Sequence, residues 1–275
     1  MLIAGVRRCA AVAILTTVDD VADPRVDDFR DLTAADRRPD RPGGRGLVIA
    51  EGVVVVRRLL DSPYPVRSLL GVPRRLAELD LSTVDAPAYA ADADTMSRIV
   101  GFHLNRGVLA VADRAPTPSV EQVAKGRLLA VLEGVNDHEN LGGLFRNAAA
   151  LGVDGVLLGP RCADPLYRRS VRVSMGHVLR VPFAPLAGPW PASLAALTHT
   201  IVALTPGADS VPLAAAGLAG RRVALLLGAE GPGLSREALR AAHLRVRIPM
   251  ASGVDSLNVA TAAAVAFHTV AAPLA

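Results

Sequence analysis

Cysteine, lysine and long apolar runs are all scarce in this chain of 275 residues. Its two cysteines, Cys9 and Cys162, stand far apart, which excludes a disulfide framework and a metal site with cysteine spacing. No apolar run reaches the roughly 18 residues that a membrane span needs. We therefore expect a globular protein of the reducing cytoplasm, without a metal and without a membrane partner.

The first residues loosely resemble a secretory signal, because Arg7 and Arg8 precede an apolar stretch. Acidic residues follow at Asp19, Asp20 and Asp23, and no small-residue cleavage site of the usual kind is present. We interpret residues 1–21 as an N-terminal extension, either poorly ordered or strand-forming.

Basic charge is carried almost entirely by arginine, since Lys125 is the only lysine among 30 basic residues. The net excess of +4 over the 26 acidic residues lies beyond Lys125. Arginine binds phosphate bidentately and stacks on bases, which suits RNA. A bias in genomic base composition would give the same preference, so charge alone favours RNA only weakly.

Residues 22–113 alternate short apolar segments with short helical patterns, which is typical of a compact α/β sandwich. We predict strands at 47–50, 66–72, 87–93 and 107–112, and helices at 23–32, 51–60, 95–100 and around Arg74, Arg75 and Glu78. This half has no paired carboxylates, metal spacing or nucleophile constellation, so we expect it to bind and not to catalyse. The Pro-rich and polar residues 114–126 form the best linker candidate.

Residues 127–275 begin with a predicted βαβ unit: a strand at 128–133, a turn-rich loop at 134–143, a helix at 144–151 closed by Gly152, and a strand at 153–158. This unit implies a parallel sheet. It also places Arg146 in the first helical turn, near the sheet edge where open α/β sheets bind ligands. Because Asn136, Asn140 and two glycines precede Arg146, a phosphate or RNA contact is favoured over an ordinary solvated side chain.

Further strands are predicted at 178–181, 200–205 and 222–227. A basic helix beginning near residue 166 carries Arg168, Arg169 and Arg172, which form either an RNA contact or a solvated face. The glycine-rich loop at 228–235 lacks both the spacing of a dinucleotide fingerprint and the Gly-Lys-Ser/Thr of a Walker loop.

The stretch 248–258 places small residues between an apolar strand end and an Ala-rich run that we predict to be helical from Val259. Small residues before a helix let backbone groups approach a ligand. The simpler alternative is that Asp255 or Ser256 caps the helix and nothing binds there.

Three stretches, 136–152, 225–235 and 248–258, resemble in order and spacing the three motifs of the SpoU (TrmH-type) RNA ribose methyltransferases of the SPOUT class. Residues 164–165 and 172–176 also resemble that family, and residues 22–113 resemble its ribosomal-protein-like substrate-binding domain. The resemblance covers residues 22–268. It departs at Gly143, where the family often has Ala, and at Asn147, where it often has Thr.

The resemblance implies an α/β fold in which residues 127–275 form a catalytic domain with a parallel sheet and a deep trefoil knot. Knots are otherwise very rare. It also implies S-adenosylmethionine bound in the knot and a homodimer formed through the C-terminal domain. The implied cofactor-binding residues are Leu204, Thr205, Leu227, Gly228, Glu230, Gly231, Ile248, Met250, Ser256, Leu257 and Asn258. The implied catalytic residues are Asn140, Arg146, Glu230, Ser256 and Asn258, and the implied RNA contacts are Arg146, Arg168, Arg169 and Arg172.

The implied activity is methylation of a ribose 2′-oxygen in RNA. Ribosomal RNA is favoured because shorter relatives that act on transfer RNA lack the N-terminal domain. Transfer RNA remains an alternative, as does a non-catalytic RNA-binding or ribosome-assembly factor; DNA is not expected. Arg146, Glu230, Ser256 and Asn258 together argue against a silent relative. A guanidinium is essentially never deprotonated in proteins, so we expect Arg146 to orient the ribose hydroxyl and not to act as a simple base.

Overall fold

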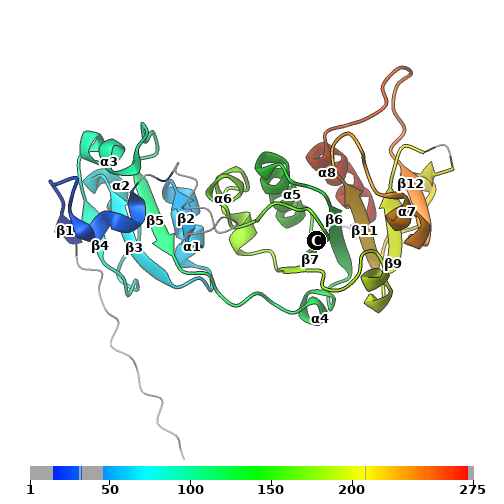
Figure 1. The fold of residues 1–275 in the computed structure, drawn as a ribbon, viewed down its shortest axis with the longest axis horizontal. Coiled ribbons are helices and arrows are strands. Elements are labelled where there is room, and N and C mark those ends of the chain that lie inside the picture. The colour runs from blue at the N-terminus through cyan, green and yellow to red at the C-terminus, as the bar shows by residue number, and fades with distance from the viewer. Residues whose placement is uncertain (1–14, 31, 33–45, 208, 272–275) are drawn as a thin grey trace, which may run out of the picture. The chain divides into compact units, whose positions relative to one another are not determined.

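The computed structural model describes residues 15–30, 32, 46–207 and 209–271. The chain forms two compact units, Met1–Ala115 and Pro116–Ala275, each with its own sheet (Figure 1). Most of the expected N-terminal extension lies outside the described residues. Its last part includes a short strand, which agrees with the strand-forming interpretation.

The N-terminal unit is built on a five-stranded sheet with the order β1-β4-β3-β5-β2. β1, β4 and β3 are parallel, and β5 is antiparallel to both β3 and β2. The strands are Leu15–Thr17 (β1), Val48–Glu51 (β2), Val66–Gly71 (β3), Ala88–Ala90 (β4) and Val108–Ala112 (β5). The helices are Pro24–Phe29 (η1, a 3-10 helix), Val53–Leu60 (α1), Pro73–Leu76 (α2) and Ala93–Val100 (α3). Every element predicted for this half forms, with its ends shifted.

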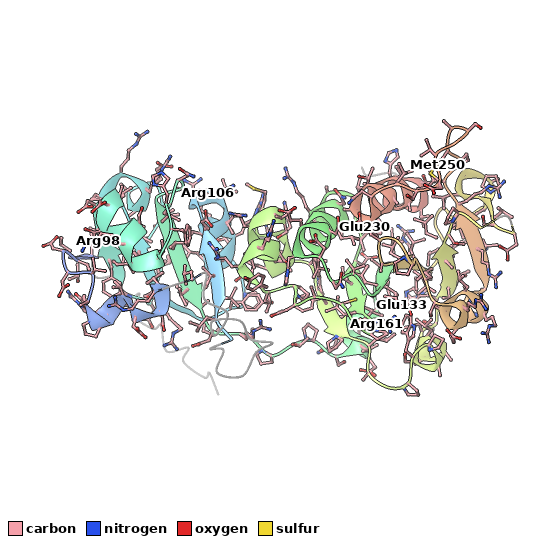
Figure 2. All side chains as sticks on the ribbon, turned by 45° about the horizontal axis from the view of Figure 1, so that its top comes forward. Arg98, Arg106, Glu133, Arg161, Glu230 and Met250 are labelled. Atoms are coloured by element: carbon pink, nitrogen blue, oxygen red, sulfur yellow. The ribbon has the colours of Figure 1, made fainter. Side chains whose placement is uncertain are left out.

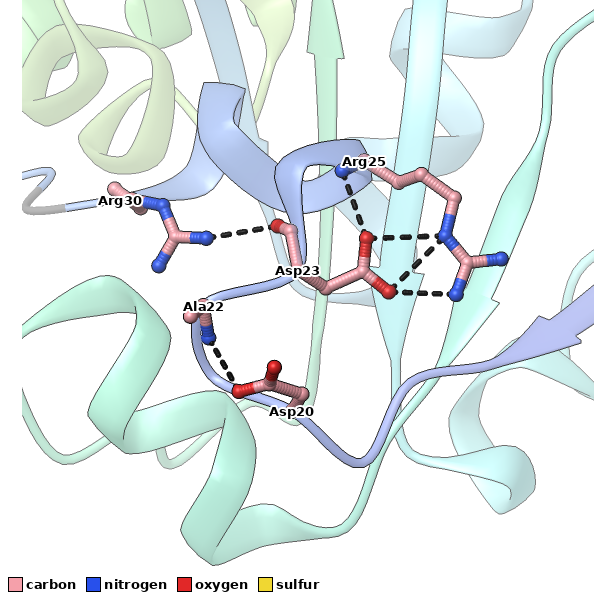
Figure 3. A network of polar contacts seen from close by, with 5 residues as sticks. All are labelled: Asp20, Ala22, Asp23, Arg25 and Arg30. Carbon is pink, nitrogen blue, oxygen red and sulfur yellow. Dashed lines mark hydrogen bonds and ion pairs between the residues drawn. The ribbon is translucent and has the colours of Figure 1, made fainter.

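One face of this sheet is covered by η1 and α3, because Phe29 and Ile99 pack with Leu70 and Leu109 in a buried cluster. The segment entering η1 is fixed by a polar network (Figure 3). Asp23 accepts hydrogen bonds from the backbone N and the Nε of Arg25 at 2.9 and 3.0 Å. The guanidinium of Arg25 lies 5.8 Å from the ring centroid of Tyr89 on β4, so the network ties η1 to the sheet.

The C-terminal unit has a seven-stranded sheet with the order β10-β12-β9-β11-β6-β7-β8, and all its neighbouring strands are parallel. The strands are Leu128–Glu133 (β6), Gly155–Leu158 (β7), Phe183–Pro185 (β8), Thr200–Leu204 (β9), Val211–Pro212 (β10), Val223–Gly228 (β11) and Leu244–Arg247 (β12). From β6 the chain moves outward to β7 and β8, then returns to the other side of β6 with β9 and β11. The sheet therefore has a topological switch point between β6 and β11, where open α/β sheets bind ligands.

Helices cover both faces of the parallel sheet, as its fully buried strands require. The helices of this unit are Val120–Val123 (α4), His138–Ala150 (α5), Arg168–Val173 (α6), Arg236–Ala241 (α7) and Val259–Val270 (α8), with 3-10 helices at His177–Leu179 (η3), Ala192–Ala196 (η4) and Leu213–Ala215 (η5). Val123 of α4, Leu194 of η4 and Ala238 of α7 share one buried cluster with the sheet. On the other face α5 lies beside both α6 and α8.

The helix after β6 begins at His138, so the prediction of a loop as far as residue 143 was wrong. Asp137 is the N-cap, and its carboxylate accepts hydrogen bonds from the backbone N of Glu139 and of Asn140, both at 2.8 Å. The glycines at 142 and 143 suggested a loop, but here they permit close helix packing. Arg146 consequently lies in the third turn of α5, not in the first. The rise of a helix puts it about 12 Å along the axis from His138.

Two other local predictions were also wrong. Residues 178–181 do not form a strand: Met175 and Gly176 have positive φ angles and turn the chain into η3, and the strand follows later as β8. Residues 120–123, expected as a polar part of the linker, form α4, which begins with a capping box between Ser119 and Gln122. Val123 is buried against the sheet, so this segment is folded onto the C-terminal unit.

Candidate functional site

The residues implied as cofactor-binding gather on segments that leave the carboxyl edge of the parallel sheet. Leu204 and Thr205 lie at the end of β9, and Leu227 and Gly228 at the end of β11. The backbone N of Thr205 donates to the carbonyl of Val246 at 2.9 Å, which joins the ends of β9 and β12. The local fold therefore places these motif residues at one sheet edge.

Three of the implied catalytic residues are joined directly by hydrogen bonds. The Nδ2 of Asn258 donates to Oδ1 of Asn140 at 2.6 Å and to Oε1 of Glu230 at 2.7 Å. Asn140 lies in the first turn of α5, and Glu230 follows β11 (Figure 2). Motifs distant in sequence thus converge on one amide group.

Asn258 is also the N-cap of α8. Its Oδ1 accepts hydrogen bonds from the backbone N of Ala260 at 3.0 Å and of Thr261 at 3.2 Å. The alternative in which Asp255 or Ser256 caps this helix is wrong, because Asn258 occupies the cap. A second link between α5 and α8 runs from Nδ2 of Asn147 to the carbonyl of Ala260, at 2.8 Å. The departure from the family at residue 147 therefore supplies a helix–helix contact.

The loop after β11 folds back on itself. Ala229 and Gly233 form an isolated antiparallel bridge, and the N of Gly233 donates to the carbonyl of Ala229 at 3.0 Å. A Cβ on Gly228 would lie 2.3 Å from the carbonyl carbon of Gly233, so only glycine fits there. Gly231 has a φ of 81° and is exposed. The loop therefore presents backbone groups and Glu230 at the sheet edge.

The segment 248–257 follows β12 and extends outward as a loop before α8 (Figure 1). Ile248 and Met250 are half-buried, whereas Ser256 and Leu257 are exposed. The hydroxyl of Ser256 donates to Oδ1 of Asp255 at 3.4 Å. Ser256 and Leu257 therefore do not belong to the hydrogen-bonded group of Asn258, Asn140 and Glu230, which we call the Asn258 cluster.

Arg146 is exposed on α5 and has no ion pair or side-chain hydrogen bond with any residue that the structure describes. Among the other arginines implied as RNA contacts, Arg169 donates from Nε to Oε1 of Glu139 at 3.1 Å. That hydrogen bond raises the pKa of Arg169 above its ordinary value. Arg168 and Arg172 lie with it on α6. The guanidinium of Arg146 is thus available, while that of Arg169 is held in place.

Sequence reasoning missed Glu133, a carboxylate buried at the end of β6 and only 2% exposed. It accepts hydrogen bonds from Nε1 of Trp190 at 2.7 Å and from the backbone N of Ser235 at 2.9 Å. The signal was a single acidic residue closing an otherwise apolar strand. Cys162 lies nearby, and burial raises the pKa of its thiol, which makes it a poor nucleophile near neutral pH.

No helix among the described residues is long and apolar enough to span a membrane. The described part of the chain also holds no group of three or more His, Cys, Asp or Glu side chains that could bind a metal ion.

Comparison with known proteins gives three findings. Residues 127–268 match the model of the SpoU rRNA Methylase family. An uncharacterized tRNA/rRNA methyltransferase of Mycobacterium tuberculosis is 59% identical over 272 residues, which cover 95% of this chain and 94% of the relative. A 23S rRNA (guanosine-2′-O-)-methyltransferase of Burkholderia is 30% identical over 190 residues, which cover 67% of this chain and 76% of the relative.

Solved structures agree with these relatives. The AdoMet-bound rRNA methyltransferase of Sinorhizobium meliloti matches with a TM-score of 0.76 at 26% identity, covering 93% of this chain and 97% of that one. The match extends over both units of the chain, so the N-terminal unit also has a counterpart there.

Proposed function

Because this chain belongs to the SpoU rRNA Methylase family of RNA methyltransferases, we propose that it transfers a methyl group from S-adenosylmethionine to a ribose 2′-oxygen of ribosomal RNA. The observation that carries the proposal is the Asn258 cluster. Its amide joins Glu230 and Asn140 at 2.7 and 2.6 Å, so a residue from each of the three motifs meets at one point.

S-adenosylmethionine fits the carboxyl edge of the sheet, and the Sinorhizobium relative carries AdoMet. Gly228 has no room for a side chain and Gly231 has a positive φ, so the loop offers backbone groups to a ligand. Ile248 and Met250, which are half-buried, would supply apolar surface for an adenine ring. The cofactor would hold the methyl group on a sulfonium, ready for displacement. We place it among the residues named from the resemblance, from Leu204 to Asn258.

The protein's task in this reaction is to position the ribose oxygen, since a 2′-hydroxyl is a poor nucleophile near neutral pH. Arg146 would donate hydrogen bonds to the ribose or to a neighbouring phosphate and stabilise developing negative charge. It keeps its own proton, because a guanidinium is essentially never deprotonated in proteins. The proton of the ribose hydroxyl would be shared with a phosphate of the substrate and released to water. Asn140, Glu230 and Asn258 would hold the ribose or the cofactor, and Ser256 would contact the substrate.

Arginines support RNA as the substrate. Arg168, Arg169 and Arg172 lie on α6, next to α5, which carries Arg146. Arg169 is already oriented by Glu139, and an ordered guanidinium loses less conformational entropy when it binds a phosphate. We assign RNA binding to these side chains and substrate recognition to the N-terminal unit, in a cytoplasmic enzyme.

We further propose that residues 248–270 pass through a trefoil knot and that two copies associate through the C-terminal unit. Exposed apolar side chains support a second copy on this side: Val254 is 51% exposed, Leu257 39% and Val265 40%. Light scattering tests the dimer, because a dimer has twice the 28.5 kDa mass of one chain.

The deciding experiment is transfer of a tritiated methyl group from S-adenosylmethionine to separate pools of ribosomal and transfer RNA. A 2′-O-methyl group removes the hydroxyl that alkali needs to cleave the chain. The product should therefore be an alkali-resistant dinucleotide from ribosomal RNA. If only transfer RNA is labelled, transfer RNA is the substrate in place of ribosomal RNA. If neither pool is labelled, the result supports a non-catalytic RNA-binding or ribosome-assembly factor.

A further inference from the structure

Glu133 is a buried carboxylate that the proposed chemistry does not use. Burying a charge is costly unless hydrogen bonds satisfy it, and Glu133 receives two. Oε1 accepts from Nε1 of Trp190 and Oε2 from the backbone N of Ser235. Arg161 adds only a distant charge, with its Nη2 3.8 Å away and its side chain 72% exposed (Figure 2).

Two of the residues that Glu133 contacts lie at the two ends of the loop after β11. In the parallel pairing of β6 with β11, Glu133 stands opposite Gly228, where the loop begins. Its carboxylate binds the N of Ser235, where the loop ends and α7 is capped. One residue thus fixes the start of the loop through its backbone pairing and the end through its side chain.

Glu230 lies between these two ends, and its Oε1 accepts the hydrogen bond from Nδ2 of Asn258 that links the loop to α8. Glu230 is exposed, and Gly231 and Gly233 beside it have positive φ angles. The tip of the loop, residues 230–233, is therefore exposed, and besides its own bridge from Ala229 to Gly233 only the hydrogen bond to Asn258 holds Glu230 in place among the described residues. Its geometry depends on how firmly the ends are held.

Trp190 supplies the hydrogen-bond donor for the second oxygen of the carboxylate. A Cβ on Gly159 would lie 3.0 Å from Cζ3 of Trp190, so glycine at this position lets the indole lie close to the end of β7. The indole N–H occupies one oxygen of Glu133, which leaves the other oxygen to accept from Ser235. The tryptophan itself makes no hydrogen bond to the loop.

We propose that Glu133 is a positioning residue that holds the 228–235 loop, and with it Glu230, in the geometry that binds the cofactor. The proposal rests on the proposed function in that it takes this loop as part of the S-adenosylmethionine site. A carboxylate is required because both donors are N–H groups, and only a group with two acceptor oxygens satisfies them together.

The test compares E133Q, W190F and the double variant E133Q/W190F in the full chain. An amide has one acceptor oxygen, so in E133Q an NH2 group must face either Trp190 or Ser235. In the double variant the phenyl ring has no N–H, and the amide oxygen can turn back to Ser235. Hydrogen exchange of the 229–235 amides without ligand, and calorimetry with S-adenosylmethionine, are measured on each protein. V123A serves as a control that destabilises the same core without touching Glu133.

In E133Q we expect the backbone amide hydrogen of Ser235 to exchange about tenfold faster than in the wild type, and S-adenosylmethionine to bind about tenfold more weakly. W190F and V123A should leave both values within about twofold of wild type, and the double variant should recover most of the loss. The proposal would be overturned if E133Q and V123A, compared at matched stability, changed Ser235 exchange and S-adenosylmethionine affinity equally. It would also be overturned if the losses of E133Q and W190F added up in the double variant. If the wild type binds no S-adenosylmethionine the proposed function fails, and Ser235 exchange still decides whether Glu133 holds the loop.

Discussion

Nδ2 of Asn258 lies 2.7 Å from Oε1 of Glu230, and this hydrogen bond joins the N-cap of α8 to the loop after β11. The oxygen of the same amide caps α8 through two backbone N–H groups. Asn258 therefore has a structural task on one atom and a site-building task on the other. Substitutions can separate them.

N258D should keep the cap, because a carboxylate oxygen can replace the amide oxygen, but it puts a second negative charge against Glu230. N258A removes both contacts, and loss of the cap costs about 1 kcal/mol of stability. We expect the rate of methyl transfer to fall by about 10- to 100-fold in both variants. The temperature of thermal unfolding should fall mainly in N258A. Tritium transfer and thermal denaturation measure these effects. Wild-type transfer by N258D would remove the Asn258–Glu230 contact from the mechanism.

Arg146 should be needed for transfer but not for folding or cofactor binding, because it is exposed and makes no side-chain hydrogen bond to any described residue. We expect R146A to lose transfer by at least about 100-fold, with unchanged thermal stability and S-adenosylmethionine affinity. R146K is the matched control, since it keeps the charge and loses the planar pair of donors. If R146K transfers as wild type does, charge is sufficient. Full activity in R146A would exclude the residue from the reaction.

Sequence patterns located the central strands of the C-terminal sheet well, because fully buried parallel strands are continuous apolar runs. The short strands β8 and β10 were not predicted. The segments 128–133 and 200–205 became β6 and β9 with little change. Helix starts were harder. Asp137 is a good N-cap, but the glycines at 142 and 143 suggested a longer loop, and Arg146 was assigned to the wrong turn. The contact that requires glycine at position 142 comes from α6, which a local pattern does not contain.

Residues 136–152, 225–235 and 248–258 could be grouped only through resemblance to a family. No local rule brings Asn140, Glu230 and Asn258 to one point, because that depends on how the strands are ordered across the sheet. Glu133 was missed for a similar reason. Its partners, Trp190 and the backbone of Ser235, lie far along the chain, so the one local signal, an acidic residue that ends an apolar strand, does not show that its carboxylate is buried.

His199 should make stability fall at mildly acidic pH. It is 3% exposed, and burial lowers its pKa below the ordinary value of 6.5. Nε2 lies 2.9 Å from the carbonyl of Gly126, while Nδ1 has no partner among the described residues. A proton added at Nδ1 would therefore be buried without an acceptor. The nearby charges are Arg222, which also lowers the pKa, and Asp154, which raises it.

The unfolded chain takes up this proton as the pH falls below about 6.5, but the folded chain does not until a lower pH. The stabilisation is therefore complete above 6.5 and is lost as the pH falls toward the folded pKa, at no more than about 1.4 kcal/mol per pH unit. Urea unfolding from pH 8 to pH 5 measures the slope. H199Q keeps a donor toward Gly126 and should flatten the curve. An identical pH slope in H199Q would assign the acid sensitivity to other groups.

Gly142 should resist replacement although it lies inside a helix. Alanine normally stabilises a helix interior by about 1 kcal/mol over glycine. Here a Cβ would lie 2.8 Å from Cβ of Val173 and 2.9 Å from the carbonyl oxygen of Ser170, both on α6. The backbone of α6 would have to move, so we expect G142A to lower the free energy of unfolding by about 1–3 kcal/mol.

G143A is the matched control, because the neighbouring glycine meets only Cβ of Ala260, at 3.1 Å, and the family often has Ala there. Its gain in helix propensity should nearly offset the tighter contact and keep the change within about 1 kcal/mol. Denaturant unfolding of both variants gives the comparison. Equal stabilities would mean that α6 can shift without cost, and that Gly142 does not set the distance between α5 and α6. A larger loss of unfolding free energy in G142A would instead show that α6 cannot move away from α5, the helix that carries Asn140 and Arg146.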